Sequence, residues 1–293
     1  MTEKLPSLGI APGSSRGIGT GPVPLSVGRR SAALIVLCSG LMMVILDGTV
    51  VAVALPSIQR DLGFSAADLT WVVGAYLVPF GGLLLLAGRL GDQFGRRRVF
   101  LSGLLTFTVA SALCGLATSS ATLIVARFGQ GVGGAIASSV ILGMIVSLFP
   151  AERERARAIG VYSFVGAGGA AIGLLAGGLV TQTHGWHWVF LINVPVGILT
   201  AVAAIMVVPA DRSDPTGHDR AGRHTDVSGA VLITSGLMLA VFTITRTPTQ
   251  AWASLSTVLG ATLSVVLIGA FLLREWNARD PLLPLAFLRE RRV

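Results

Sequence analysis

Charged side chains are scarce in this 293-residue chain. They make up 12% of the residues, whereas an ordinary soluble domain carries roughly 25%. Hydrophobic residues reach 53%, and the mean hydropathy is +0.77. Several apolar runs approach or exceed the roughly 20 residues that a helix needs to cross a bilayer. This composition excludes a soluble globular protein and predicts an all-α polytopic membrane protein that contacts membrane lipid along most of its length.

Cysteine is nearly absent, and both cysteines, Cys38 and Cys114, lie inside apolar runs. Two isolated cysteines exclude a disulfide framework and a cysteine-based metal site. The net charge of +8 would suggest nucleic acid in a soluble protein. Here the basic residues lie between apolar runs, where cytoplasmic loops are expected. We therefore predict no metal and no nucleic-acid partner.

Eight membrane spans are predicted from hydropathy. They cover roughly residues 31–55, 69–88, 99–117, 121–148, 157–180, 188–208, 227–246 and 255–273. Of the 22 basic residues, Arg60 and Arg246 fall on one side, Arg127 lies within a span, and all the others share the opposite side. By the positive-inside rule, we expect both termini to be cytoplasmic. We also expect the protein to lie in the cytoplasmic (inner) cell membrane.

Polar segments between the spans divide the chain into five parts. The first, residues 1–30, is rich in glycine, proline and serine, which is typical of a disordered cytoplasmic tail. The others are a six-span bundle (31–208), a cytoplasmic linker (209–226), two accessory spans (227–273) and a cytoplasmic amphipathic segment (274–293).

Three glycines in the tail have the spacing of a dehydrogenase cofactor loop: Gly13, Gly17 and Gly19. Such a loop needs a strand before the glycines and a helix after them, so that the helix N-terminus faces a pyrophosphate. Neither flanks them in this sequence. We therefore interpret the spacing as coincidence and expect neither a cofactor nor an enzyme.

One carboxylate and one cation lie well inside the spans, Asp47 in the first and Arg127 in the fourth. A charge in lipid costs several kcal/mol unless it is paired or faces water, so each is a functional candidate. Burial favours the neutral acid and a nearby guanidinium favours the carboxylate, so such a pair can couple proton binding to another event. The alternative is that Asp47 only shapes its helix near Gly48 and that Arg127 extends to the membrane surface.

The loop GRLGDQFGRRRVF, from Gly88 to Phe100, carries a second pattern. Gly88 and Gly95 supply permissive backbone on either side of Asp92. Asp92 can accept hydrogen bonds from backbone amides and pair with Arg96 or Arg97. Positive-inside signalling alone explains the arginines but not the whole arrangement, so these residues are candidates for a conformational gate.

These motifs resemble those of a known family. GRLGDQFGRRR is similar to the signature loop between helices 2 and 3 of the major facilitator superfamily, and LIVARFGQGVGGA to its proton-coupling motif in helix 4. LDGTVVAVALP and WHWVFLINVPVG resemble the first helix and the start of the sixth in its drug:proton antiporter branch with fourteen spans. The resemblance implies a multidrug exporter in which Asp47 binds the proton, Arg127 adjusts its affinity, and Asp92 with Arg96 and Arg97 gates the cytoplasmic side.

The fifth span departs from the family pattern. It keeps Gly169, Gly173, Gly177 and Gly178 but has Leu174 where the antiport motif of the family has proline. The glycines still predict a closely packed helix. Whether coupling is antiport therefore stays open.

The family's second six-helix bundle has no counterpart in this sequence. Because alternating access needs two bundles around a midplane site, we expect either a truncated product or a chain that works with another chain. On this interpretation the protein uses the proton gradient to export small lipophilic, drug-like or antibiotic molecules and contributes to antibiotic resistance. The alternative is a non-transporting or regulatory membrane remnant that keeps the fold motifs.

Overall fold

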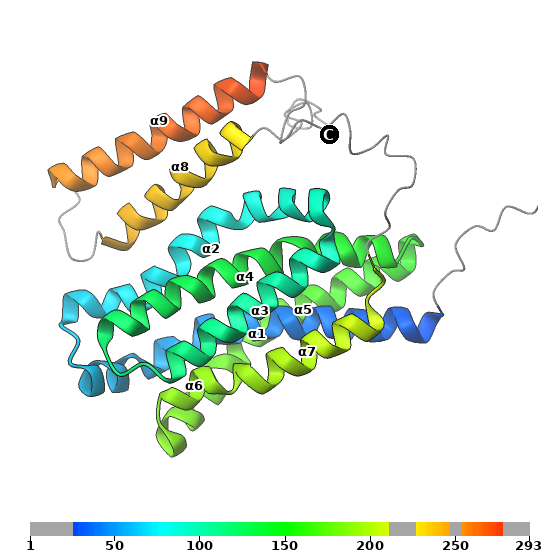
Figure 1. Ribbon diagram of the computed structural model, residues 1–293, viewed down its shortest axis with the longest axis horizontal. Coiled ribbons are helices and arrows are strands. Elements are labelled where there is room, and N and C mark those ends of the chain that lie inside the picture. The colour runs from blue at the N-terminus through cyan, green and yellow to red at the C-terminus, as the bar shows by residue number, and fades with distance from the viewer. Residues whose placement is uncertain (1–25, 211–226, 247–253, 278–293) are drawn as a thin grey trace, which may run out of the picture.

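The computed structural model describes residues 26–210, 227–246 and 254–277 (Figure 1). Within these ranges the chain forms nine helices and no strand, so the predicted all-α architecture is confirmed. The helices are α1 (Val27–Leu62), α2 (Ala66–Phe94), α3 (Arg96–Gly115), α4 (Ser120–Leu148), α5 (Glu152–His184), α6 (His187–Leu191), α7 (Asn193–Val207), α8 (Val227–Arg246) and α9 (Leu255–Asn277).

All eight predicted spans lie on these helices. Seven stretches of the described chain are long and apolar enough to cross a bilayer, and one of them, His187–Val207, combines α6 and α7. The eighth predicted span lies on α8, whose apolar part, Val231–Ile244, is shorter. The helices therefore follow the hydropathy pattern closely.

The predicted segment boundaries shift at both ends of the spans. Helix α1 begins at Val27, so residues 27–30 of the predicted tail are helical, because the backbone N–H of Arg30 already donates to Ser26. Helix α9 continues to Asn277, into the predicted amphipathic segment. The predictions for the rest of that segment, the tail before residue 26 and the linker after residue 210 fall outside the described residues.

Helices α1 to α7 pack as one bundle. Helix α1 contacts α2, α4, α5, α6 and α7, and α4 packs against both α2 and α3. The pair α8 and α9 lies outside this bundle, along α2 (Figure 1). Because α1 and α4 touch so many neighbours, polar groups on their inner faces are surrounded by protein.

Helix ends are set by local chemistry. The Ser65 hydroxyl accepts a hydrogen bond from the backbone N–H of Asp68 and begins α2, and Ser119 does the same for Thr122 and α4. At the end of α1, Gly63 has φ of +65°, a left-handed conformation that glycine adopts without a steric penalty. Short turns of this kind bring α1 and α2 side by side.

The sixth span consists of α6 and α7, which meet at Ile192. Pro195 has no N–H to donate to the carbonyl of Leu191. Ile192 nevertheless keeps helical angles (φ −62°, ψ −26°), and its N–H donates to the carbonyl of Trp188, so the chain stays helical through this point. Asn193 is the first residue of α7, and its side chain is buried. The sequence predicted one span from 188 to 208, and the apolar stretch His187–Val207 matches it.

Both ends of the sixth span are bonded to α1. At the α7 end, Arg29 Nη2 donates to the carbonyl of Met206 at 3.2 Å. Before α6, Trp186 Nε1 donates to Asp61 Oδ2 at 2.8 Å. The sixth span therefore runs along α1 with a polar contact at each end.

Candidate functional site

Asp47 and Arg127 meet in the middle of the bundle. Arg127 Nη1 lies 2.5 Å from Asp47 Oδ2. The two residues come from α1 and α4, which pack directly against each other, and their exposed fractions are 1% and 0%. The structure thus brings together, as a buried ion pair, the carboxylate and the cation that the sequence placed inside spans.

Gln130 lies on the same face of α4, one turn after Arg127. Its Oε1 accepts a hydrogen bond from Arg127 Nη1 at 2.9 Å, and its Nε2 donates to Asp47 Oδ1 at 2.9 Å. The amide therefore bridges both members of the ion pair. Gln130 also accepts from Cys114 Sγ on α3 at 3.1 Å.

Two further polar residues complete the cluster. Asn193 Nδ2 donates to Asp47 Oδ1 and to Ser111 Oγ, each at 3.1 Å. Gln130 Nε2 reaches the same Ser111 hydroxyl at 2.6 Å. We name Asp47, Ser111, Arg127, Gln130 and Asn193 the polar cluster; all five are buried.

The guanidinium of Arg127 is also held from the side of α2. Its Nε donates to the carbonyl of Val72 at 3.0 Å. Its Cζ lies 4.4 Å from the ring centroid of Tyr76 and 5.7 Å from that of Phe190, within the range of cation–π attraction. The Tyr76 hydroxyl in turn donates to the carbonyl of Val44 on α1 at 3.2 Å.

The polar cluster supplies hydrogen-bond donors to both carboxyl oxygens of Asp47. These oxygens accept from Arg127, Gln130 and Asn193, and hydrogen bonds to a charged group are worth about 1.5–3 kcal/mol each. Buried charges persist only when they are paired and hydrogen-bonded in this way. A proton added to Oδ1 would meet two amide donors, so proton binding requires the cluster to rearrange.

The predicted gate residues link the α2–α3 turn to α4. Arg96 forms an ion pair with Asp92 at 3.1 Å, and its Nη1 donates to the carbonyl of Gly143 on α4 at 2.9 Å. Gly95 joins α2 to α3 with φ of +98°, so the turn requires glycine. A carbon added at Gly88 would meet no atom within 4 Å, so nothing in its surroundings requires glycine there.

Arg97 has a different partner from Arg96. Its Nη2 donates to the carbonyl of Ile205, in the last turn of α7, at 2.5 Å. The two neighbouring arginines therefore hold α4 and α7 respectively. One short turn is thereby connected to two helices that also carry residues of the polar cluster.

Glycines of α5 pack against α1. A side-chain carbon at Gly169 would lie 2.9 Å from Met42 Sδ, and one at Gly173 would collide with the Thr49 hydroxyl. A side-chain carbon at Gly177 would lie 2.7 Å from Val50 Cγ1, whereas one at Gly178 would have only Val53 nearby, at 3.8 Å. Leu174, in place of the expected proline, points outward and is half exposed. Three of the four predicted glycines therefore form the α1–α5 contact.

Sequence reasoning missed Ser111, Gln130 and Asn193. Gln130 could have been found, because it lies three residues after Arg127 and so on the same helix face. Asn193 and Ser111 are neutral polar residues inside apolar runs, which is a weaker signal. Their relevance depends on which helices meet, and the sequence alone does not show that.

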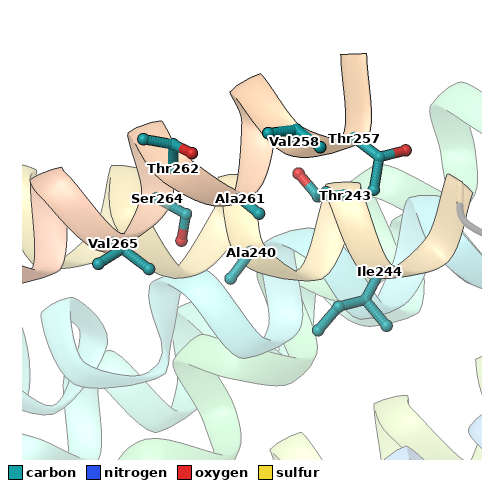
Figure 2. A pocket seen from close by; sticks show the side chains of 9 residues that line it. All are labelled: Ala240, Thr243, Ile244, Thr257, Val258, Ala261, Thr262, Ser264 and Val265. Carbon is teal, nitrogen blue, oxygen red and sulfur yellow. The ribbon is translucent and has the colours of Figure 1, made fainter. Parts of the chain in front are cut away.

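A separate cavity of about 370 Å³ lies between α8 and α9. Figure 2 shows its lining residues, which come from these two helices only. The hydroxyls of Thr243 and Ser264 donate to carbonyls of α8, so they offer little to a ligand. The lining carries no charged side chain, so the cavity is suited to an apolar hydrocarbon group.

The family comparison covers most of the chain. Residues 37–276 match the family model described as the Major Facilitator Superfamily. Solved structures that share the fold include the following two. A bacterial homologue of the human lysosomal transporter Spinster, inward-facing and unoccupied, has a TM-score of 0.56 at 20% identity over 88% of this chain and 65% of that chain. The proton:xylose symporter XylE has a TM-score of 0.57 at 16% identity over 77% of this chain and 55% of that chain.

Curated relatives include antibiotic resistance and export proteins. The puromycin resistance protein pur8 of Streptomyces alboniger is 43% identical over 90% of this chain and 50% of its own length. The cephamycin export protein CmcT of Amycolatopsis lactamdurans is 40% identical over 87% of this chain and 52% of its own length. The tetracenomycin C resistance and export protein of Streptomyces glaucescens is 39% identical over 89% of this chain and 48% of its own length. The chain thus spans about half the length of these relatives.

Proposed function

The chain belongs to the Major Facilitator Superfamily, and we propose that it supplies the proton-binding bundle of an exporter of antibiotic-like small molecules. Its relatives include proteins named for resistance to puromycin and tetracenomycin C and for export of cephamycin. The proposed transport exchanges an inward proton for an outgoing lipophilic molecule. The proton gradient supplies the energy, and no cofactor takes part.

The buried pair of Asp47 and Arg127 carries this proposal. An ionisable carboxylate inside a membrane bundle is costly, and intramembrane ionisable groups mark ion and proton pathways. Asp47 lies where its charge is balanced by one cation and two amides. In the proposed mechanism a proton neutralises Asp47, the ion pair with Arg127 loosens, and the change in packing between α1 and α4 favours the other conformation.

The gate residues act at the cytoplasmic end in this proposal. Asp92 and Arg96 bind the α2–α3 turn to α4, and Arg97 binds it to α7. Release of these contacts would let α4 and α7 move relative to α2. Since basic residues concentrate at this end of the bundle, we assign it to the cytoplasm, with both termini on that side of the cytoplasmic membrane.

Transport by alternating access needs a second bundle opposite the first. The described residues form one bundle and an accessory helix pair. In our proposal the second bundle comes from further sequence of the same protein or from another chain. The partners of this chain are therefore membrane lipid, protons, a small lipophilic substrate and that second bundle.

Loss of the carboxylate tests the proposal directly. Everted membrane vesicles from cells that make the protein are energised to an acidic interior, and uptake of radiolabelled puromycin is measured with and without nigericin. We expect nigericin-sensitive uptake by the wild type. Asp47→Asn cannot exchange a proton, so its uptake falls to the level of vesicles without the protein.

Asp68→Asn is the matched control, because Asp68 is an exposed carboxylate at the start of α2 and its hydrogen bond with Ser65 is available to asparagine. It should transport like the wild type. Wild-type transport by Asp47→Asn would refute the role of the carboxylate. If the wild type moves neither puromycin, tetracenomycin C nor a cephamycin, the alternative of a non-transporting membrane protein is favoured.

A further inference from the structure

We propose that Asn193 is a positioning residue that sets the pH at which Asp47 exchanges its proton. The inference rests on the proposed proton coupling and adds a residue to it. Its basis is the place of Asn193, the first residue of α7, with its side chain on Asp47 Oδ1 and Ser111 Oγ.

Protonation of Asp47 at Oδ1 changes what that oxygen needs. As a carboxylate oxygen it accepts from Gln130 Nε2 and Asn193 Nδ2. As a hydroxyl it donates, and it then faces two donors. One of the two amides must therefore turn or withdraw. The step forms one O–H bond with a proton from water, and deprotonation returns that proton.

Gln130 is held in its present orientation by its oxygen. Its Oε1 accepts from Arg127 Nη1 at 2.9 Å and from Cys114 Sγ at 3.1 Å, and turning the amide would place nitrogen against both. Asn193, within the described residues, makes its side-chain hydrogen bonds through Nδ2 alone. A half-turn of its amide presents an oxygen that accepts from both the Asp47 and the Ser111 hydroxyls. Asn193 can thus serve both charge states.

Few other ionisable groups face Asp47. Arg127 comes from α4, Tyr76 from α2 and Cys114 from α3. The sequence of α7 has no ionisable residue, and α5 has none between Tyr162 and His184. Arg127 is the only cation of this set, and the other donors to the carboxylate are the two amides. Removal of one amide donor should therefore change the proton affinity measurably.

The test measures the protonation of Asp47 without transport. Infrared spectra of the full protein in lipid vesicles are recorded against pH, and the carbonyl band of the protonated Asp47 carboxyl is identified by its loss in Asp47→Asn. Asn193→Leu removes a donor from the carboxylate, and Asn193→Asp also adds a like charge. Both disfavour the ionised form, so the midpoint of the band should move to higher pH, by about one unit or tenfold in proton affinity for Asn193→Leu.

Thr200→Val, a similar-sized change at another buried position of α7, is the control and should leave the midpoint where the wild type has it. Unchanged midpoints in both folded Asn193 variants would overturn the proposal. So would failure of both variants to fold at any pH, since Asn193 would then be a residue that the fold requires. If the wild type does not transport puromycin but the midpoints shift as expected, the proposed function fails and the role of Asn193 stands.

Discussion

Arg127 is the largest fully buried side chain of the described residues. Its guanidinium reaches α1 through Asp47, α2 through the carbonyl of Val72, and Gln130 on its own helix. The guanidinium makes these bonds from several nitrogens that lie in one plane. Lysine has a single ammonium nitrogen and cannot reproduce this arrangement. Arginine at this position therefore ties together three helices as well as neutralising a carboxylate.

Replacement of Arg127 by leucine should destabilise the bundle strongly. The Asp47 carboxylate would stay buried with only the two amides as donors, and breaking a buried pair by removing one partner costs about 3–5 kcal/mol. Thermal unfolding of the detergent-solubilised protein measures the loss. The double variant Asp47→Asn, Arg127→Leu removes both charges and should recover part of the stability. A double variant less stable than Arg127→Leu would contradict this account of the pair.

At this scale the sequence predicts the charged members of the site and not the neutral ones. Asp47 and Arg127 stand out because any charge in a membrane span is costly. Asn193 and Ser111 gain their importance only from contact with Asp47, across helices that are far apart in sequence. Hydropathy carries no information on such contacts.

The contact between α1 and α5 depends on three glycines spaced four residues apart, and the helix offers a neighbouring glycine for comparison. A methyl group at Gly177 would lie 2.7 Å from Val50 Cγ1 and 2.9 Å from its Cα, whereas one at Gly178 would lie 3.8 Å from Val53 Cγ1. Both Val50 distances are collisions, and the one to Cα is with backbone, whereas the distance to Val53 is ordinary contact.

Gly177→Ala should therefore lower the stability of the bundle by about 1–3 kcal/mol through overpacking. Gly178→Ala should be neutral or raise it by up to about 1 kcal/mol, because alanine is the better helix former. Thermal unfolding of the two variants side by side measures the difference. Equal stabilities would show that the α1–α5 contact does not depend on close approach.

Span positions could be predicted because helix length and apolar composition are local properties. The prolines of the spans do not end them, since Pro56, Pro79 and Pro195 lie within α1, α2 and α7. Whether a proline interrupts a helix depends on the neighbours that satisfy the lost hydrogen bond. That information is tertiary.

For the whole molecule, helix connections alternate between two ends of the bundle. The α1–α2, α3–α4 and α5–α6 junctions lie at one end, and the α2–α3 and α4–α5 junctions at the other (Figure 1). The arginines of the described bundle concentrate at the second end, with Arg60 at the first. This separation matches the charge asymmetry read from the sequence and supports the proposed orientation.

Cysteine labelling tests that orientation. Thr118 and Ala151 are exposed residues at opposite ends of the bundle. In intact cells an impermeant maleimide should label Thr118→Cys, whereas Ala151→Cys should react only after the membrane is permeabilised. The wild type serves as background, because Cys38 and Cys114 are buried. The reverse pattern of labelling would place the predicted cytoplasmic end outside.

The polar contacts at the two ends of the sixth span restrict how that span can respond to events at Asp47. Trp186 is bonded near the last turn of α1, and Met206 is bonded to Arg29 near its first turn. The hydrogen bonds at the two ends of the sixth span oppose its sliding lengthwise along α1. We therefore expect a displacement that begins at Asn193 to be largest in the middle of the span, between the two contacts.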